Sequence, residues 1–541
     1  MPRTVVKRRD YPPLVLAVGV MVLLLALFPS ALNLPQTNPS ETLEYAPVPP
    51  DDEAADEQLA GNLSSLSLAG GQSLAAGEEG EAAASLPADP AIARTPSSKR
   101  CVGRPPRQTP DPLSPPCVSY FRGDNFGSTY SGVTRDEIKV LFVLDANLGR
   151  TTDAGTEDET QYQGQYFDLG QPASDDENSV SLRNLRRFQR YFNERYQTYG
   201  RFVHFWAYFS TPAGGDRLGE RTPETRRADA AENYSHLKPF TAMTTQLELG
   251  LGETYADAMA EHDVLLFGSE SGNQPKAKYA RYPGLIWSYT PTLERSADLY
   301  ASYVCEKVIG QPVVDSGNAA DMGKPRRLGL LRTTDATRPG LVALGKLVKQ
   351  KIEACGGEFV EEATFDEVGY DLLGTDDPTP ATANMARFQE SGVTTVIWGG
   401  GHENKHSAAA ARLGYLPEWI LAGDTFSEGA GAGGDQNQTA WRYASIVTSA
   451  TPVDKTEDTF CGGALREADP TIGGRDLFWG CLDVPWYPDI RQLFSGIQVA
   501  GPRLTPSAID KGFHAIPAVA STSPDLPACF YEPGDYTCVK D

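Results

Sequence analysis

Residues 402–406 read HENKH, which matches the H-E-x-x-H pattern of zinc proteases. In those enzymes two histidines one helical turn apart hold the metal, and the glutamate between them activates its water. Such a site also needs a helical setting and a third ligand further along the chain. Here the pattern opens a helix directly after three glycines, no H-x-x-G-x-x-H extension follows, and Glu418 and Glu428 lie beyond Pro417. A zinc protease is therefore kept only as a remote alternative.

No other set of catalytic residues stands out. The chain has neither a G-x-S-x-G nucleophile elbow nor a P-loop, and its six histidines leave little general-base chemistry to assign. We therefore predict a protein that is not an enzyme, with no catalytic residues, no metal and no cofactor.

The charge of the chain bounds its partners. Its 71 acidic residues outweigh 48 basic ones, which gives a formal net charge of -23. A field of that sign repels phosphates, so no nucleic acid partner is expected.

The N-terminus indicates export. Basic residues within positions 1–13 precede an uncharged, largely apolar run at 14–34. That run is long enough to span a bilayer, and its flanking positive charges favour a cytoplasmic N-terminus. A cleaved signal peptide is the rival interpretation, but the Pro-Ser-Ala at 29–31 is a poor cleavage site. We favour a single-pass signal-anchor in the cell membrane, with the folded part extracellular or periplasmic.

Eight cysteines agree with an exported protein, and none shows the C-x-x-C spacing of a zinc or redox site. Disulfides are the favoured interpretation, although eight cysteines permit about 105 connectivities. Three pairs are close in sequence: Cys101/Cys117, Cys461/Cys481 and Cys529/Cys538. These pairs leave Cys305 with Cys355.

Residues 35–118 are rich in Pro, Ala, Ser, Gly and Glu, and we expect a disordered stalk there. The folded domain is expected at 119–541, with a first lobe at about 132–289, a second at about 291–450, and a C-terminal part at 451–541 that completes both lobes.

Short apolar runs alternate with amphipathic helical stretches through both lobes, which predicts α/β architecture with parallel sheets covered on both faces. Two such sheets describe a two-lobed protein with a cleft. The expected strands are 140–144, 201–209, 239–245, 263–268 and 285–291, and then 327–333, 358–365, 393–400 and 419–424.

Four stretches in this order resemble the type I periplasmic-binding-protein superfamily, specifically the leucine-type (branched-chain amino acid) substrate-binding proteins of ABC transporters in their actinobacterial surface form. They are GVTRDEIKV at 132–140, RFQRYFNERYQTYGRFVHF at 187–205, RRLGLLRTTDATRPGLVALGKLVKQKIEACGGEFVEEATF at 326–365, and LFSGIQVAGPRLTP at 493–506. The resemblance implies two Rossmann-like lobes that capture a small solute, an amino acid or a related compound, and deliver it to an ABC permease. Many such proteins carry a lipobox cysteine, whereas the first cysteine here is Cys101.

Because ligands bind beyond the carboxyl ends of parallel strands, the residues after each strand are the ligand-binding candidates. Relatives use hydroxyls at such positions to hold an amino acid carboxylate, and an acid near Asp424 to pair with an ammonium. Each candidate also has a structural interpretation as a turn or helix-capping residue. The candidates are Ser269, Glu270, Ser271, Ser288, Tyr289, Thr334, Thr337, His402, Glu403 and Asp424.

A receptor from another functional class also fits this organisation. The same two-lobed domain on a membrane anchor would serve as a ligand-sensing receptor without transport. No cytoplasmic signalling domain precedes the anchor, so transport is the favoured hypothesis.

Overall fold

The computed structural model describes residues 102–538 apart from internal ranges. The ranges outside the description within that span are 105, 146–158, 175–176, 211–222, 245–251, 269–273, 335–338, 366–378, 400–403, 423–436, 448–455, 479, 482–485 and 517–528.

The first sheet has six strands in the order β2-β3-β1-β4-β5-β6. β2 pairs antiparallel with β3 at one edge, and all other neighbouring pairs are parallel. Counted along the chain, the parallel strands follow the order 2-1-3-4-5, which is a doubly wound arrangement. The strands are β1 (Glu137–Asp145), β2 (Tyr166–Asp168), β3 (Phe202–Ser210), β4 (Thr241–Met243), β5 (Leu265–Phe267) and β6 (Ile286–Trp287).

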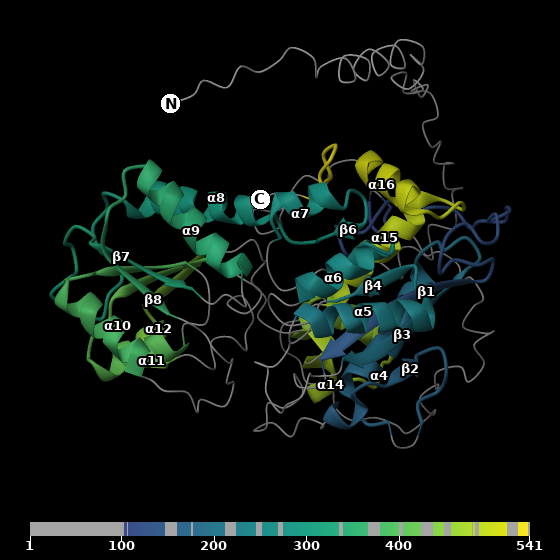
Figure 1. The fold of residues 1–541 in the computed structure, drawn as a ribbon, viewed down its shortest axis with the longest axis horizontal. Coiled ribbons are helices and arrows are strands. Elements are labelled where there is room, and N and C mark those ends of the chain that lie inside the picture. The colour runs from purple at the N-terminus through teal and green to yellow at the C-terminus, as the bar shows by residue number, and fades with distance from the viewer. Residues whose placement is uncertain are drawn as a thin grey trace, which may run out of the picture. The chain divides into compact units, whose positions relative to one another are not determined.

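Helices from both ends of the chain cover this sheet. The apolar stripe of α4 (Val180–Arg195) is fully buried at Leu182, Leu185 and Phe188, as its helical spacing predicts. In Figure 1 the yellow C-terminal helices lie beside the blue and teal elements of this sheet. The remaining elements here are η4 (Glu159–Tyr162), α5 (Pro223–Leu237), α6 (Gly252–Ala260), α7 (Lys276–Arg281), η7 (Thr456–Asp458), α13 (Phe460–Ala468), α14 (Gly474–Phe478), α15 (Trp486–Ala500) and α16 (Pro506–Ala515).

The second sheet has five parallel strands in the order β11-β10-β9-β7-β8. Along the chain this is again 2-1-3-4-5, so the two sheets are wound alike. The strands are β7 (Leu328–Thr333), β8 (Phe359–Phe365), β9 (Thr395–Trp398), β10 (Glu418–Ala422) and β11 (Ala444–Val447).

Side chains of the second sheet alternate between two cores. Val396 and Trp398 of β9 pack in one core, and Ile397 between them packs in the other. Helices therefore cover both faces, as continuous apolar runs predict. These helices are α8 (Leu293–Tyr303), the π-helix η6 (Val304–Val308), α9 (Pro339–Ala354), α10 (Thr379–Glu390), α11 (Asn404–Arg412) and α12 (Gln438–Trp441). The predicted α/β class with two parallel sheets is confirmed.

The stalk was expected to extend to residue 118, and the structure corrects this boundary. Residues 106–117, here called the strap, pack into the first core, with Gln108 and Asp111 0% and 2% exposed. The composition was misleading because the strap is anchored by buried polar groups instead of an apolar stripe. At the other end, the core residues of α13, α15 and α16 belong to the first sheet, although residues 451–541 were expected to complete both lobes.

Three of the predicted disulfides are present: Cys305–Cys355, Cys461–Cys481 and Cys529–Cys538. Cys117 is also disulfide-bonded, and Cys101 lies outside the described residues. The predicted anchor at 14–34 lies outside them too. Within the described part of the chain, no helix combines the length and the apolar character needed to cross a bilayer.

Candidate functional site

In a doubly wound sheet, ligands bind at the carboxyl ends of the strands, at the point where the strand order reverses. In the first sheet the order reverses at β1, because β3 lies on one side of it and β4 on the other. Two hydroxyls flank the carboxyl end of β1. Ser210 closes β3 and pairs in register with Asp145, and Thr244 follows β4. Both residues are 0% exposed, and neither hydroxyl oxygen has a hydrogen-bond partner in the described part of the chain. Buried hydroxyls are nearly always hydrogen-bonded, so this pair is suited to a polar ligand.

Ser210 and Thr244 were not among the predicted site residues. Their signal was nevertheless present, because each is the hydroxyl residue that directly follows a buried apolar run, in YFS and in TAMT. The same strand-end rule selected Ser269 and Ser288. The two hydroxyls carry no sequence signal beyond this position, because a single Ser or Thr after a strand is most often a turn or capping residue.

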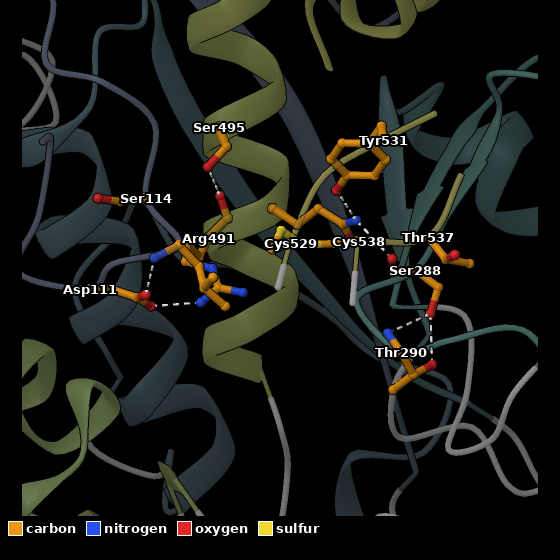
Figure 2. Close-up of a disulfide and its surroundings, with 12 residues drawn as sticks. Asp111, Ser114, Ser288, Thr290, Arg491, Ser495, Cys529, Tyr531, Thr537 and Cys538 are labelled. Atoms are coloured by element: carbon orange, nitrogen blue, oxygen red, sulfur yellow. Dashed lines mark hydrogen bonds and ion pairs between the residues drawn. A yellow bond between two sulfur atoms is a disulfide. The ribbon is translucent and has the colours of Figure 1, made fainter. Parts of the chain in front are cut away.

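Ser288 lies within the described residues, and its hydrogen bonds are to other parts of the same chain. Its backbone N–H donates to the carbonyl of Tyr536 at 3.0 Å, and its carbonyl accepts from the backbone N–H of Cys538 at 3.2 Å and from Gln492 Nε2 at 3.0 Å. A parallel bridge to Thr537 places the C-terminal segment alongside β6. The side chain of Ser288 lies 2.9 Å from the hydroxyl of Thr290, as Figure 2 shows.

Tyr289, the next candidate, lies at a buried ion pair. The guanidinium carbon of Arg491 is 5.1 Å from the centre of its ring, and Arg491 Nη1 donates to Asp111 Oδ2 at 2.6 Å. Burial alone would lower the pKa of Arg491, but the charge of Asp111 and nearby tyrosines outweigh burial and raise it. Arg491 therefore stays charged. Asp111 and Arg491 are 380 residues apart, so spacing gave no signal for this pair.

A cavity of about 30 Å³ lies beside this ion pair, lined among others by Leu113, Tyr289, Arg491 and Tyr531. A space of this size holds about one water molecule and no amino acid. Tyr289 therefore faces a water-sized cavity in the described structure.

In the second lobe only Thr334 is described among the predicted site residues. It follows β7, is exposed, and donates from both its backbone N–H and its hydroxyl to the carbonyl of Phe365, at 2.8 and 3.1 Å. The predicted site residues outside the described ranges are Ser269, Glu270, Ser271, Thr337, His402, Glu403 and Asp424.

His406, the second histidine of the HENKH pattern, lies in α11 against aromatic rings. Its ring centre is 4.8 Å from that of Phe365 and 5.8 Å from that of Trp398, and its Nε2 lies 3.3 Å from Asn384 Nδ2. Burial lowers the pKa of His406 to about 3, so it is neutral at physiological pH. Across the described ranges, no three His, Cys, Asp or Glu residues are grouped to hold a metal ion.

No family model matches the chain, and no curated protein matches it. Solved structures do match. One is a solute-binding protein of an ABC transporter from R. palustris in complex with 4-hydroxybenzoate, with TM-score 0.47, 14% identity, and coverage of 74% of this chain and 90% of that one. Another is a branched chain amino acid ABC transporter protein from Thermus thermophilus with bound valine, with TM-score 0.49, 12% identity, and coverage of 75% and 91%.

A third match is a substrate-binding protein of an ABC transporter from Aeropyrum pernix, with TM-score 0.47, 13% identity, and coverage of 75% of this chain and 91% of that chain. All three neighbours are named as proteins of ABC transporters. The ligands 4-hydroxybenzoate and valine are those of the neighbours.

Proposed function

We propose that this chain is an extracytoplasmic solute-binding protein, which captures a small polar solute at the carboxyl ends of its parallel strands. The observation that carries the proposal is the pair of buried hydroxyls of Ser210 and Thr244 on either side of β1, which have no hydrogen-bond partner among the described residues. Two sheets of the same doubly wound order in one chain support it, since such sheets bind ligands at this edge.

The proposal extends to the setting of the protein. We propose capture between the two lobes, an amino acid or a related carboxylate as the solute, delivery to an ABC permease, and an N-terminal membrane anchor that keeps the folded part outside the cytoplasm. The sequence resemblance and the basic-then-apolar N-terminus support these points. The strand-end residues in both lobes, from Ser269 to Asp424, stay the predicted contacts.

A thermal-shift screen tests the proposal. The melting temperature of the chain would be measured in the presence of amino acids, amides, short peptides, sugars and aromatic acids in turn. A solute that binds the folded state raises the melting temperature in proportion to the logarithm of its concentration over its dissociation constant. If no small solute in the panel raises the melting temperature, the proposal fails.

Two substitutions on β4 and its end then locate the site. Thr244→Val removes a hydroxyl that has no partner in the described chain, so we expect unchanged stability and about tenfold weaker binding of the solute. Thr241→Val is the matched control, because the Thr241 hydroxyl donates to the carbonyl of Leu265 at 2.9 Å. We expect that control to lose about 1 kcal/mol of stability and to keep its affinity. Calorimetry measures the affinity and urea unfolding the stability. If Thr244→Val keeps its affinity and Thr241→Val loses it, the solute does not bind at the end of β1.

A further inference from the structure

The strap is held by polar contacts at positions that water does not reach. Gln108, Thr109, Asp111 and Ser114 are each 2% exposed or less. Gln108 Nε2 donates to the carbonyl of Arg195, and the carbonyl of Pro116 accepts from Gln498 Nε2 at 2.9 Å. Buried segments are usually held by apolar side chains, so four buried polar residues within positions 108–114 make this a specific docking interface.

Asp111 is the centre of that interface. One carboxylate oxygen accepts from the backbone N–H of Leu113 at 2.8 Å and the other from Arg491 at 2.6 Å, so both oxygens are engaged (Figure 2). Arg491 is 6% exposed and its guanidinium lies over the ring of Tyr289. Arg491 therefore forms a buried receptor for a carboxylate, and the strap supplies the carboxylate from its own chain.

The same turn of α15 also holds the crossing, which we define as residues 288–292, between β6 of the first sheet and α8 of the second. Arg491 contacts Asp111 and Tyr289, while its neighbour Gln492 donates to the carbonyl of Ser288 at 3.0 Å and to the hydroxyl of Tyr531 at 2.7 Å. At the far end of the crossing, the Thr292 hydroxyl accepts from the backbone N–H of Arg295 and caps α8. Strap and crossing thus rest on adjacent side chains of one helix.

We propose that the strap is a conformational latch: the docking of Asp111 in the carboxylate receptor at Arg491 holds the crossing, and release of the strap loosens the connection between the two lobes. The latch is polar on both sides, because the hydroxyls of Thr109 on the strap and of Tyr196 beside it are both buried. Undocking the strap exposes these groups to water, which offsets part of its cost.

Hydrogen exchange of the full chain tests the latch. No solute is added, so the result of this experiment does not depend on the proposed function. In Asp111→Ala we expect exchange to accelerate by about tenfold or more both in the strap, at residues 106–117, and in the crossing, at residues 288–292. Sodium formate should slow both again by filling the carboxylate receptor, whereas sodium chloride at equal concentration should not. Residues 328–333 of β7 report that the variant remains folded.

Asp124→Asn is the matched control. Asp124 forms an exposed ion pair with Arg135 at 3.3 Å, a few residues beyond the strap, and its loss should leave both segments unchanged. Asp111→Asn keeps the size of the side chain and should give an intermediate acceleration in both segments. Faster exchange in the strap alone would overturn the coupling, and unchanged exchange in the strap would overturn the role of Asp111.

Discussion

His204 lies between two carboxylates that come from different strands. Its Nδ1 contacts Glu137 at the start of β1, and its Nε2 contacts Asp168 at the end of β2. Burial alone would lower the pKa of His204, but the hydrogen bonds and charges of Asp168 and Glu137 raise it above 6.5. In turn, the contact with His204 outweighs burial and lowers the pKa of Asp168. His204 therefore joins β2 to the rest of the first sheet through its contacts with both carboxylates.

This arrangement predicts a pH-dependent stability. Because the pKa of His204 is raised in the folded state, its contribution is fully present below pH 6.5 and is lost as the pH rises through the raised value. We expect His204→Gln to lower the free energy of unfolding by about 1–3 kcal/mol under mildly acidic conditions, and by progressively less as the pH rises. Urea unfolding of both proteins over a pH series measures this. A difference that is constant over the series would contradict the assignment.

At the scale of elements, Gly132 shows how closely the entry to β1 approaches β4. Its φ is +72°, and a Cβ there would lie 2.1 Å from the backbone nitrogen of Phe240. The carbonyl of Gly132 accepts from the N–H of Lys139 at 2.9 Å, and the carbonyl of Lys139 accepts from the N–H of Phe240, also at 2.9 Å. Gly132 begins the GVTRDEIKV stretch, so that stretch includes a contact with β4.

A pair of glycine substitutions separates backbone strain from crowding. Gly310 has the same φ of +72° but nothing within 4 Å of its Cβ position. We expect Gly310→Ala to cost about 1–2 kcal/mol for the left-handed conformation alone. Gly132→Ala should cost about 4 kcal/mol or more, because the backbone of β4 must also move. Urea unfolding measures both, and equal costs would show that the approach to Phe240 relaxes freely.

The elements could be predicted from sequence wherever apolar periodicity was strong. The buried run at 140–144 and the stripe of α4 are examples, and both are confirmed. β2 was missed because its three residues are only partly buried and carry no alternation. The strap was missed because Asp111 and Arg491 meet only through the tertiary fold, and a Pro-rich polar stretch resembles a linker by composition.

The sequence alone could not select residues within the candidate site. The strand-end rule points to the carboxyl edge of a sheet, but it does not distinguish hydroxyls that have hydrogen-bond partners within the protein from those that lack them. Ser288 and Thr334 have partners within the chain, whereas Ser210 and Thr244 lack them among the described residues. That distinction depends on distances between side chains, which periodicity does not contain.

At the scale of the whole molecule, the strap sets where a folded chain can begin. A chain that starts at residue 120 lacks Asp111 and leaves Arg491 as a buried, unpaired cation, whereas a chain that starts at residue 98 keeps the pair. We expect the shorter chain to be about 3–5 kcal/mol less stable in urea unfolding. Arg491→Met in the shorter chain should recover part of the loss, since it removes the unpaired charge. Equal midpoints for the two lengths would show that the strap adds no stability.

The segment that runs from Cys529 to Cys538 has a consequence beyond the contacts of Ser288. It covers the backbone N–H and carbonyl of Ser288, the residue that directly follows β6, the last strand of the first sheet. The opposite margin ends in the short antiparallel β2. An open strand margin is a template for pairing with another chain. The bridge at Ser288 and the short β2 therefore leave less open strand margin on the first sheet for pairing with another chain.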